Sequence, residues 1–99
     1  MNGIQFLVRT TSRFDRMVKA LVGKHPDVKM VLVEVAEALR DDPFNRSRQH
    51  QIKKLEDVEP GDGQYRLRLG RWRIRYDIFK EKHEVVLVFV GLRREDTYR

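Results

Sequence analysis

The sequence predicts an α+β domain in which a helical hairpin packs on one face of a small, mostly antiparallel sheet, in the order β-α-α-β-β-β. Three observations lead to this fold class. Apolar residues recur at helical spacing between residues 14 and 39, and alternate with polar residues before and after that span. Gly70 divides the later alternating stretch as a hairpin turn would. Residues 84–90 are almost continuously apolar, which is typical of a strand inside a sheet.

The first half of the chain should contain one strand and two helices. Residues 4–9 alternate as a half-buried strand does. Thr11 or Ser12 can cap a helix that stops at Gly23, and a second apolar stripe predicts a helix ending before Asp41-Asp42-Pro43. A link this short between two helices favours a helical hairpin.

The second half should supply the remaining strands. Residues 44–55 are basic and only weakly periodic, so we expect an irregular connection entering a short strand near Ile52–Leu55. Residues 56–63 are acidic and rich in turn formers, which predicts a surface loop. A hairpin follows over residues 65–78, and residues 84–90 complete the sheet as an internal strand.

The predicted hairpin has one apolar face and one cationic face, because strand side chains alternate between the two sides. The apolar face carries Tyr65, Leu67, Leu69, Trp72, Ile74, Tyr76 and Ile78. Trp72 is the only tryptophan, and we assign it to the core. The opposite, wet face carries Arg66, Arg68, Arg71, Arg73, Arg75 and Asp77. Like charges placed directly opposite each other lower stability, so this density of arginines indicates an anionic partner.

Length and composition limit the class of protein. With 99 residues and no internal repeat, residues 1–99 should form a single domain. A net charge of +6 and a pI near 10.0 favour a polyanionic partner, either a nucleic acid or an acidic protein segment. The chain has no cysteine, which fits a reducing cytoplasm. It shows no signal peptide or membrane-spanning run, so we expect a soluble cytoplasmic protein with no membrane partner.

The residues favour chemistry based on arginine over a metal or cofactor site. His25, His50 and His83 lie in different connections without ligand-like spacing, so no metal is expected. Gly61-Asp62-Gly63 lacks the third glycine and following helix of a dinucleotide loop, which favours a plain turn and no cofactor. Guanidinium groups donate in pairs to phosphate oxygens and stay charged, as a developing phosphorane requires. Composition supports nucleic-acid binding and RNA cleavage about equally.

The candidate site combines arginines of the sheet face with residues that follow the last strand. Its members are Arg66, Arg68, Arg73, Arg93 and Tyr98. The ribose 2′-hydroxyl can serve as an internal nucleophile, so such a site needs only to orient the RNA, stabilise charge and move protons. Because no histidine is suitably placed, proton transfer would fall to Tyr98, Lys53 or Lys54.

Over nearly its whole length the chain resembles the RelE/ParE superfamily of bacterial and archaeal toxins from type II toxin-antitoxin modules. The resemblance rests on the order of four motifs: Asp42-Pro43, Lys53-Lys54-Leu55, the run from Tyr65 to Tyr76 and the run from Val90 to Tyr98. It implies the fold above and, for the RelE branch, cleavage of messenger RNA in the ribosomal A site. The alternative is a ParE-like inhibitor of DNA gyrase, although that branch generally lacks the full arginine and tyrosine set.

The resemblance also implies residue roles and partners. Arg73 and Arg93 would stabilise the scissile phosphate, and Tyr98 would stack on a base or transfer a proton. In that branch the positions of Arg66 and Arg68 are often occupied by lysine. One of these two lysines is a proposed general base there, and arginine is a poor base. The expected RNA contacts are Arg66, Arg68, Arg71, Arg75, Lys53 and Lys54. The expected partners are the ribosome with its messenger RNA and a cognate antitoxin, which alone would connect the protein to operator DNA.

Overall fold

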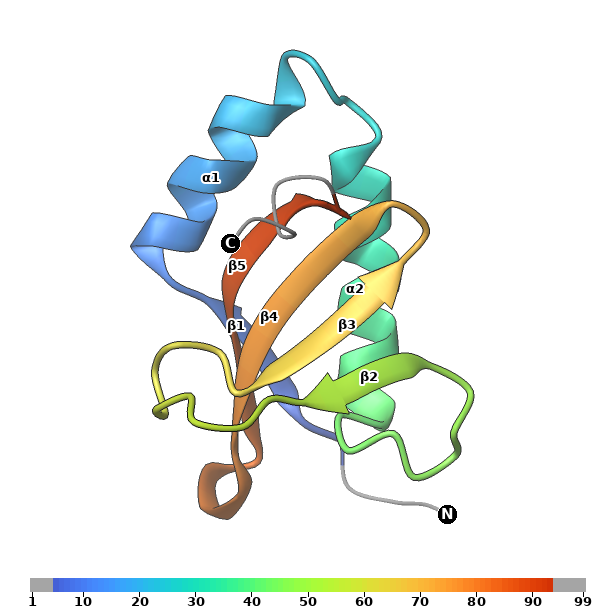
Figure 1. Cartoon of the computed structure of the whole chain (residues 1–99), viewed down its shortest axis with the longest axis vertical. Coiled ribbons are helices and arrows are strands. Elements are labelled where there is room, and N and C mark those ends of the chain that lie inside the picture. Colours follow the sequence, from blue (N-terminus) through green and yellow to red (C-terminus); the bar gives the residue numbers. More distant parts are fainter. Residues whose placement is uncertain (1–4, 94–99) are drawn as a thin grey trace.

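The computed structural model describes residues 5–93 as one five-stranded sheet with two helices (Figure 1). The elements in chain order are β1 (Leu7–Thr10), α1 (Ser12–Val22), α2 (Val28–Asp41), β2 (Gln51–Lys54), β3 (Tyr65–Leu69), β4 (Trp72–Phe79), a 3-10 turn (Lys80–Lys82) and β5 (Glu84–Leu92). The sheet order is β1-β5-β4-β3-β2, and only β1 and β5 pair in parallel. The predicted α+β class, with a mostly antiparallel sheet, is confirmed.

The observed order is β-α-α-β-β-β-β, whereas the predicted order gave three strands after the helices. The segments expected as strands after the helices, near 52–55, in the 65–78 hairpin and over 84–90, are four, and all four are observed. The short strand expected near Ile52–Leu55 is present as β2, one residue earlier, and it pairs with β3 from Gln51 opposite Arg68 to Lys54 opposite Tyr65. This strand is short and polar, because an edge strand buries little of its surface. Pairing with β3 is what gives it strand geometry.

Local sequence explains where α1 begins and ends. Thr11 is its N-cap, and the Thr11 hydroxyl accepts a hydrogen bond from the backbone N–H of Phe14 at 3.0 Å. The helix ends at Gly23, as predicted, but Gly23 has a φ of −61° in the right-handed region. The left-handed freedom of glycine is therefore not what ends α1. Within residues 5–93, neither helix is long and apolar enough to cross a membrane.

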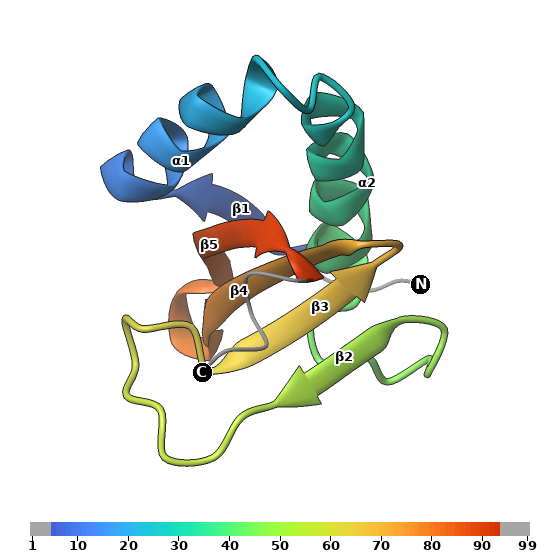
Figure 2. The same cartoon turned by 45° about the horizontal axis from the view of Figure 1, so that its top comes forward.

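Both helices lie on the same side of the sheet (Figure 2). In Figure 1, α2 lies behind β3 and β4, whereas α1 lies beside β5. The core is formed by apolar side chains of the two helices and the helix-facing side of the sheet. Its fully buried members are Phe14, Val28, Val35, Leu39, Leu67, Trp72, Ile74, Tyr76, Val85, Leu87 and Val90. The other face of the sheet is therefore available for function.

The side chains of Asp42, which is partly buried, and Tyr76, which is buried, hold the connection between α2 and β2 in place. The Asp42 carboxylate accepts hydrogen bonds from the backbone N–H groups of Arg46 (2.8 Å) and Ser47 (3.2 Å) and from the Ser47 hydroxyl (2.6 Å). Burial raises the pKa of Asp42, but these hydrogen bonds outweigh it and leave the pKa below its usual value. The Tyr76 hydroxyl donates to the carbonyl of Pro43 at 2.8 Å, and burial raises the pKa of that hydroxyl far above its ordinary value.

Trp72 lies in the core, as predicted, with only 2% of its surface exposed. Its indole N–H donates to the carboxylate of Asp27 at 3.1 Å. Asp27 is the N-cap of α2, yet its side chain makes no capping hydrogen bond. This carboxylate therefore joins the start of α2 to β4 rather than capping its own helix. The hydrogen bond from Trp72 is the main reason that the pKa of Asp27 lies below 3.8.

We expect Asp27→Asn to lower the free energy of unfolding at neutral pH but not in acid. A carboxylate whose pKa is lowered by folding stabilises the protein above its unfolded value of 3.8 and loses that contribution as the pH falls through the folded value. Urea titrations followed by the fluorescence of Trp72, the only tryptophan, measure this difference at each pH. A difference that stayed constant with pH would show that the charge of Asp27 is unimportant.

Candidate nucleic-acid interface

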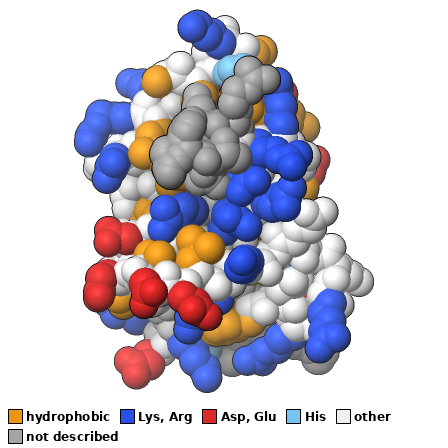
Figure 3. All heavy atoms as spheres, viewed as in Figure 1, with side chains coloured by type: hydrophobic (Ala, Val, Ile, Leu, Met, Phe, Trp, Pro, Cys, Tyr) orange, Lys and Arg blue, Asp and Glu red, His pale blue; other side chains and the backbone are white. Residues whose placement is uncertain are grey.

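The strand register places five basic residues in two neighbouring rows across the face of the sheet that the helices leave open. Lys53, Arg66 and Arg75 form the first row, on β2, β3 and β4. Arg68 and Arg73 form the second, directly opposite each other on β3 and β4. Directly opposite residues in antiparallel strands have Cα atoms about 5 Å apart, so these charges raise the local positive potential together. We call these five residues the cation rows, and Figure 3 shows basic side chains gathered over this face.

Arg93 lies at the same end of the sheet as Arg73. Gly91 on β5 is opposite Arg73, and Arg93 follows two residues later. The backbone N–H of Arg93 donates to the carbonyl of Arg71 at 2.7 Å, so the chain remains attached to the β3–β4 turn at this point. The structure thus brings two of the three predicted catalytic residues to one end of the sheet. The third, Tyr98, lies outside the described residues.

Two of the predicted RNA contacts lie apart from the cation rows. The Arg71 guanidinium is 3.6 Å from the Asp27 carboxylate and lies 5.7 Å from the centre of the Trp72 ring, so it links the β3–β4 turn to the start of α2. Lys54 alternates to the helix-bearing face, where its amino group lies 5.7 Å from the centre of the Tyr65 ring. Adjacent residues of a strand point to opposite faces, which is why Lys53 and Lys54 separate.

The expectation of a uniformly wet cationic face is wrong at Arg73 and Asp77. Arg73 is only 8% exposed and Asp77 only 1% exposed. Asp77 does lie on the predicted side of β4, but its carboxylate accepts the backbone N–H groups of Gly61, Gly63 and Gln64, each at 3.0 Å. The loop before β3 therefore folds over this carboxylate and removes it from solvent.

Arg75, on the same strand as Asp77, also holds this loop. Its Nε and Nη2 atoms donate to the carbonyl of Gly63 at 3.2 and 3.1 Å. Gly63 has a φ of +84°, and a Cβ atom there would lie 2.8 Å from both the Arg75 Cβ and a Val88 methyl. Only glycine fits this position without a shift of its neighbours. We call residues 57–64 the clamped loop, because Asp77 and Arg75 bind its backbone from one strand.

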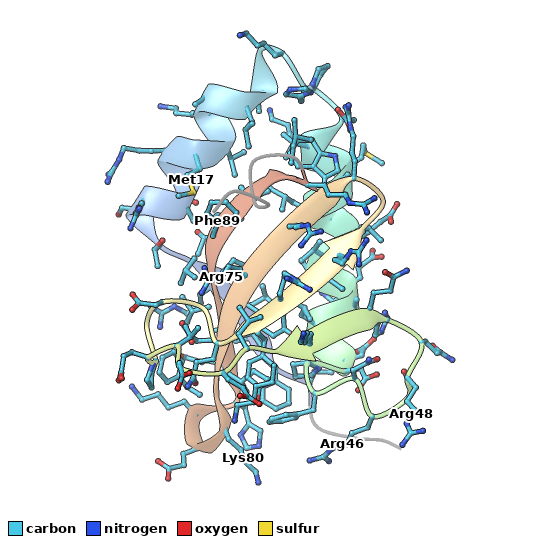
Figure 4. The ribbon with its side chains drawn as sticks, viewed as in Figure 1. Met17, Arg46, Arg48, Arg75, Lys80 and Phe89 are labelled. Carbon is cyan, nitrogen blue, oxygen red and sulfur yellow. The ribbon has the colours of Figure 1, made fainter. Side chains whose placement is uncertain are left out.

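A surface pocket of about 440 Å³ lies between α1 and the clamped loop. Figure 4 shows Met17 on α1, Phe89 below it on β5 and Arg75 farther down on β4. Acidic side chains form the edge of this region in Figure 3. The pocket, which we call the α1 pocket, is lined by Arg13, Met17, Asp57, Val58, Glu59, Gly61, Asp62, Arg75, Val88 and Phe89.

Sequence reasoning missed the clamped loop and the α1 pocket. The two glycines of Gly61-Asp62-Gly63 were a usable signal, since closely spaced glycines favour positive φ, and both glycines do have it. Nothing near them in the sequence indicated Asp77 as their partner. Within the part of the chain that the structure describes, no three His, Asp or Glu side chains are grouped so that they could hold a metal ion.

The fold is similar to that of several solved structures. Neither a protein-family model nor a curated protein sequence matches the chain. Among solved structures, a chain of the toxin-antitoxin complex RelBE2 from Mycobacterium tuberculosis is 26% identical, with a TM-score of 0.68, and the match covers 91% of this chain and 100% of that one. A metal-bound toxin from Helicobacter pylori is 21% identical, with a TM-score of 0.67, and the match covers 92% of this chain and 98% of that one. The RelE-RelB complex from Pyrococcus horikoshii OT3 contains a chain that is 19% identical, with a TM-score of 0.66, and the match covers 90% of this chain and 96% of that one.

The last two matches show the fold alone, whereas the mycobacterial match adds a closer likeness in sequence. All three extend over at least nine tenths of the present chain, so the similarity covers most of the fold. The predicted resemblance is therefore confirmed, and the chain is a RelE-like protein with the fold of the RelE/ParE superfamily.

Proposed function

We propose that this protein is the toxin of a type II toxin-antitoxin module and that it cleaves messenger RNA on the ribosome without a metal ion. The observation that supports this most directly is the pairing of Arg68 with Arg73 on one sheet face, at the end of the sheet where Arg93 emerges. Guanidinium groups carry the charge opposite to that of a phosphodiester and donate in pairs to its oxygens.

The proposed reaction uses the RNA itself as nucleophile. The 2′-oxygen loses its proton and attacks the adjacent phosphorus, and the bond to the 5′-oxygen of the next nucleotide breaks as that oxygen gains a proton. The products are a 2′,3′-cyclic phosphate and a free 5′-hydroxyl. Negative charge increases on the phosphoryl oxygens as the phosphorane forms, so the protein accelerates the reaction by placing positive charge beside those oxygens.

Arg73 is well suited to stabilise this charge. With 8% of its surface exposed, it is held in place by its surroundings and shielded from water, and both effects strengthen its interaction with a developing anion. Arg93, which is exposed, would approach the same phosphate from the end of β5. The remaining cation rows would bind the neighbouring phosphates and orient the strand.

Arginine remains protonated, so among the cation rows only Lys53 is a candidate for proton transfer. We assign the stacking or proton-transfer role to Tyr98. A site that stabilises charge well but transfers protons poorly gains most from a substrate held in the reactive geometry by another body. This is why we propose cleavage of messenger RNA positioned by the ribosome, which places the protein in the cytoplasm.

We also propose a cognate antitoxin that covers the cation rows. The mycobacterial and Pyrococcus chains above come from complexes with their antitoxins. An extended acidic segment would neutralise the same five charges that bind RNA, so binding of antitoxin and RNA would exclude each other. The protein itself would reach operator DNA only through that antitoxin.

Primer extension on messenger RNA from cells induced to express the protein tests this function. We expect cuts inside translated codons with the wild type and their loss with Arg73→Ala. Arg40→Ala is the matched control, because Arg40 is an exposed arginine in the last turn of α2, on the other side of the sheet. It should leave the cuts unchanged.

Two results would contradict the proposal. Retained cleavage in both Arg73→Ala and Arg93→Ala would remove these arginines from the reaction. Growth arrest with intact messages and a DNA-damage response would instead favour inhibition of DNA gyrase, the ParE-like alternative.

A further inference from the structure

The α1 pocket has a rigid wall that the fold builds from distant residues. Three backbone N–H groups of the clamped loop bind the buried Asp77 carboxylate, and the Gly63 carbonyl binds Arg75. Gly61 and Gly63 are both held at positive φ, of 101° and 84°. A loop fixed by so many contacts presents its lining side chains in defined positions, which is what a binding site requires.

The pocket is chemically asymmetric. Met17, Val88 and Phe89 give it an apolar surface with one aromatic ring. Arg13 and Arg75 contribute positive charge, from α1 and β4 respectively. The clamped loop contributes three carboxylates, Asp57, Glu59 and Asp62, which only accept hydrogen bonds when ionised. A matching ligand has a flat apolar part, an anionic part and hydrogen-bond donors.

Arg75 connects this pocket to the cation rows. It is directly opposite Arg66, which is opposite Lys53, so the first cation row ends at the pocket. A guanidinium has five N–H donors, and two of those of Arg75 are directed to the Gly63 carbonyl. The remaining three are available for a phosphate.

We propose that the α1 pocket binds one nucleotide of a single-stranded RNA whose phosphates follow the first cation row. The base would stack on Phe89 against Met17, and its phosphate would bind Arg75. The volume of 440 Å³ lies within the range of small-molecule sites, about 300 to 1,000 Å³. The inference deepens the proposed function, because it names a substrate subsite beside the reacting phosphate.

The carboxylates give this subsite a preference among bases. Guanine presents adjacent N1–H and N2–H donors that match two acceptor oxygens, and adenine and cytosine each present an amino group. Uracil has one N–H donor between two carbonyl oxygens. Carboxylates repel those two oxygens. Bases with an amino group should therefore bind more tightly than uracil. A lysine or arginine side chain of a protein partner is the competing occupant, because the three carboxylates outnumber Arg13 and Arg75. Only a nucleotide also supplies a phosphate for Arg75.

The test is a titration of the isotope-labelled protein, followed by amide chemical shifts, with guanosine 5′-monophosphate, uridine 5′-monophosphate, inorganic phosphate and N-acetylarginine amide. We expect guanosine monophosphate to shift the amides of Gly61, Gly63, Val88 and Phe89 and to saturate at a concentration several-fold lower than uridine monophosphate. Inorganic phosphate should shift the surroundings of Arg75 without reproducing the shifts at Phe89.

Two phenylalanines provide matched variants. Phe89→Leu should weaken binding of guanosine monophosphate by about fivefold, because an aliphatic side chain cannot stack on a base. Phe79→Leu changes an exposed phenylalanine at the far end of β4 and should have no effect. Equal weakening by both variants, or identical shifts with phosphate and with guanosine monophosphate, would overturn the subsite.

Tighter binding of N-acetylarginine amide than of either nucleotide would also overturn it, in favour of a cationic side chain from a protein partner. The titration involves neither the ribosome nor cleavage. Its failure would leave the assignment of Arg73 and Arg93 untouched, and failure of the primer-extension test would leave the nucleotide titration interpretable.

Discussion

Asp77→Ala is expected to lower the free energy of unfolding by about 3 kcal/mol, because the substitution leaves the N–H groups of Gly61, Gly63 and Gln64 without their acceptor. Each of these donors is 3.0 Å from a carboxylate that is only 1% exposed, so water does not replace it without opening the loop. For a domain of 99 residues this corresponds to a fall of at least about 10 °C in the midpoint of thermal unfolding. Calorimetry or thermal circular dichroism measures it.

Two further variants separate the hydrogen bonds from the charge. Asp62→Ala removes an exposed carboxylate from the same loop and should change stability by less than about 0.5 kcal/mol. Asp77→Asn keeps the shape but turns an amide N–H₂ toward backbone donors, so it should fall between wild type and Asp77→Ala. A loss below about 1 kcal/mol in Asp77→Ala would show that the loop does not depend on this carboxylate.

Arg73→Ala is expected to slow cleavage by at least about 100-fold in single-turnover reactions on programmed ribosomes, since it removes a shielded positive charge from the reacting phosphate. Arg73→Lys should recover only part of that rate, because an ammonium keeps the charge but loses the paired donors of the guanidinium. Arg73 is 8% exposed and lies directly opposite Arg68, so a shorter donor does not reach the same phosphate oxygens.

The control for this prediction must address folding, because Arg73 is buried. Thermal unfolding and the fluorescence of Trp72 identify a variant that has lost its structure, and Arg40→Ala shows the effect of losing an arginine elsewhere. A folded Arg73→Ala protein that cleaves within about threefold of the wild-type rate would remove Arg73 from the catalytic group.

Most of the secondary structure was predictable because it depends on neighbours in the sequence. The N-cap at Thr11, the strand β3 and the internal strand β5 all follow from capping chemistry or from the period of the apolar residues. The edge strand β2 was less evident, since its four residues bury little surface and take their geometry from pairing with β3. The end of α1 at Gly23 was predicted, although its right-handed φ was not.

The candidate site shows the same division. Alternation along a strand correctly placed Arg66, Arg68, Arg73 and Arg75 on one face, and the hairpin turn at Gly70 set Arg68 opposite Arg73. Alternation also placed Arg71 with them, but a side chain beside a turn is free to reach another element, and Arg71 reaches Asp27.

The sequence by itself determined the α+β class, the order of the elements and the existence of one cationic sheet face, because helix and strand periodicities are local properties of the chain. Only the tertiary structure decided that Asp77 lies beneath the clamped loop, that Arg75 is fixed to Gly63 and that α1 closes a pocket beside Phe89. These features join residues that are 12 or more positions apart. Their contacts depend on how complete elements pack together, and no local pattern of residue types encodes that packing.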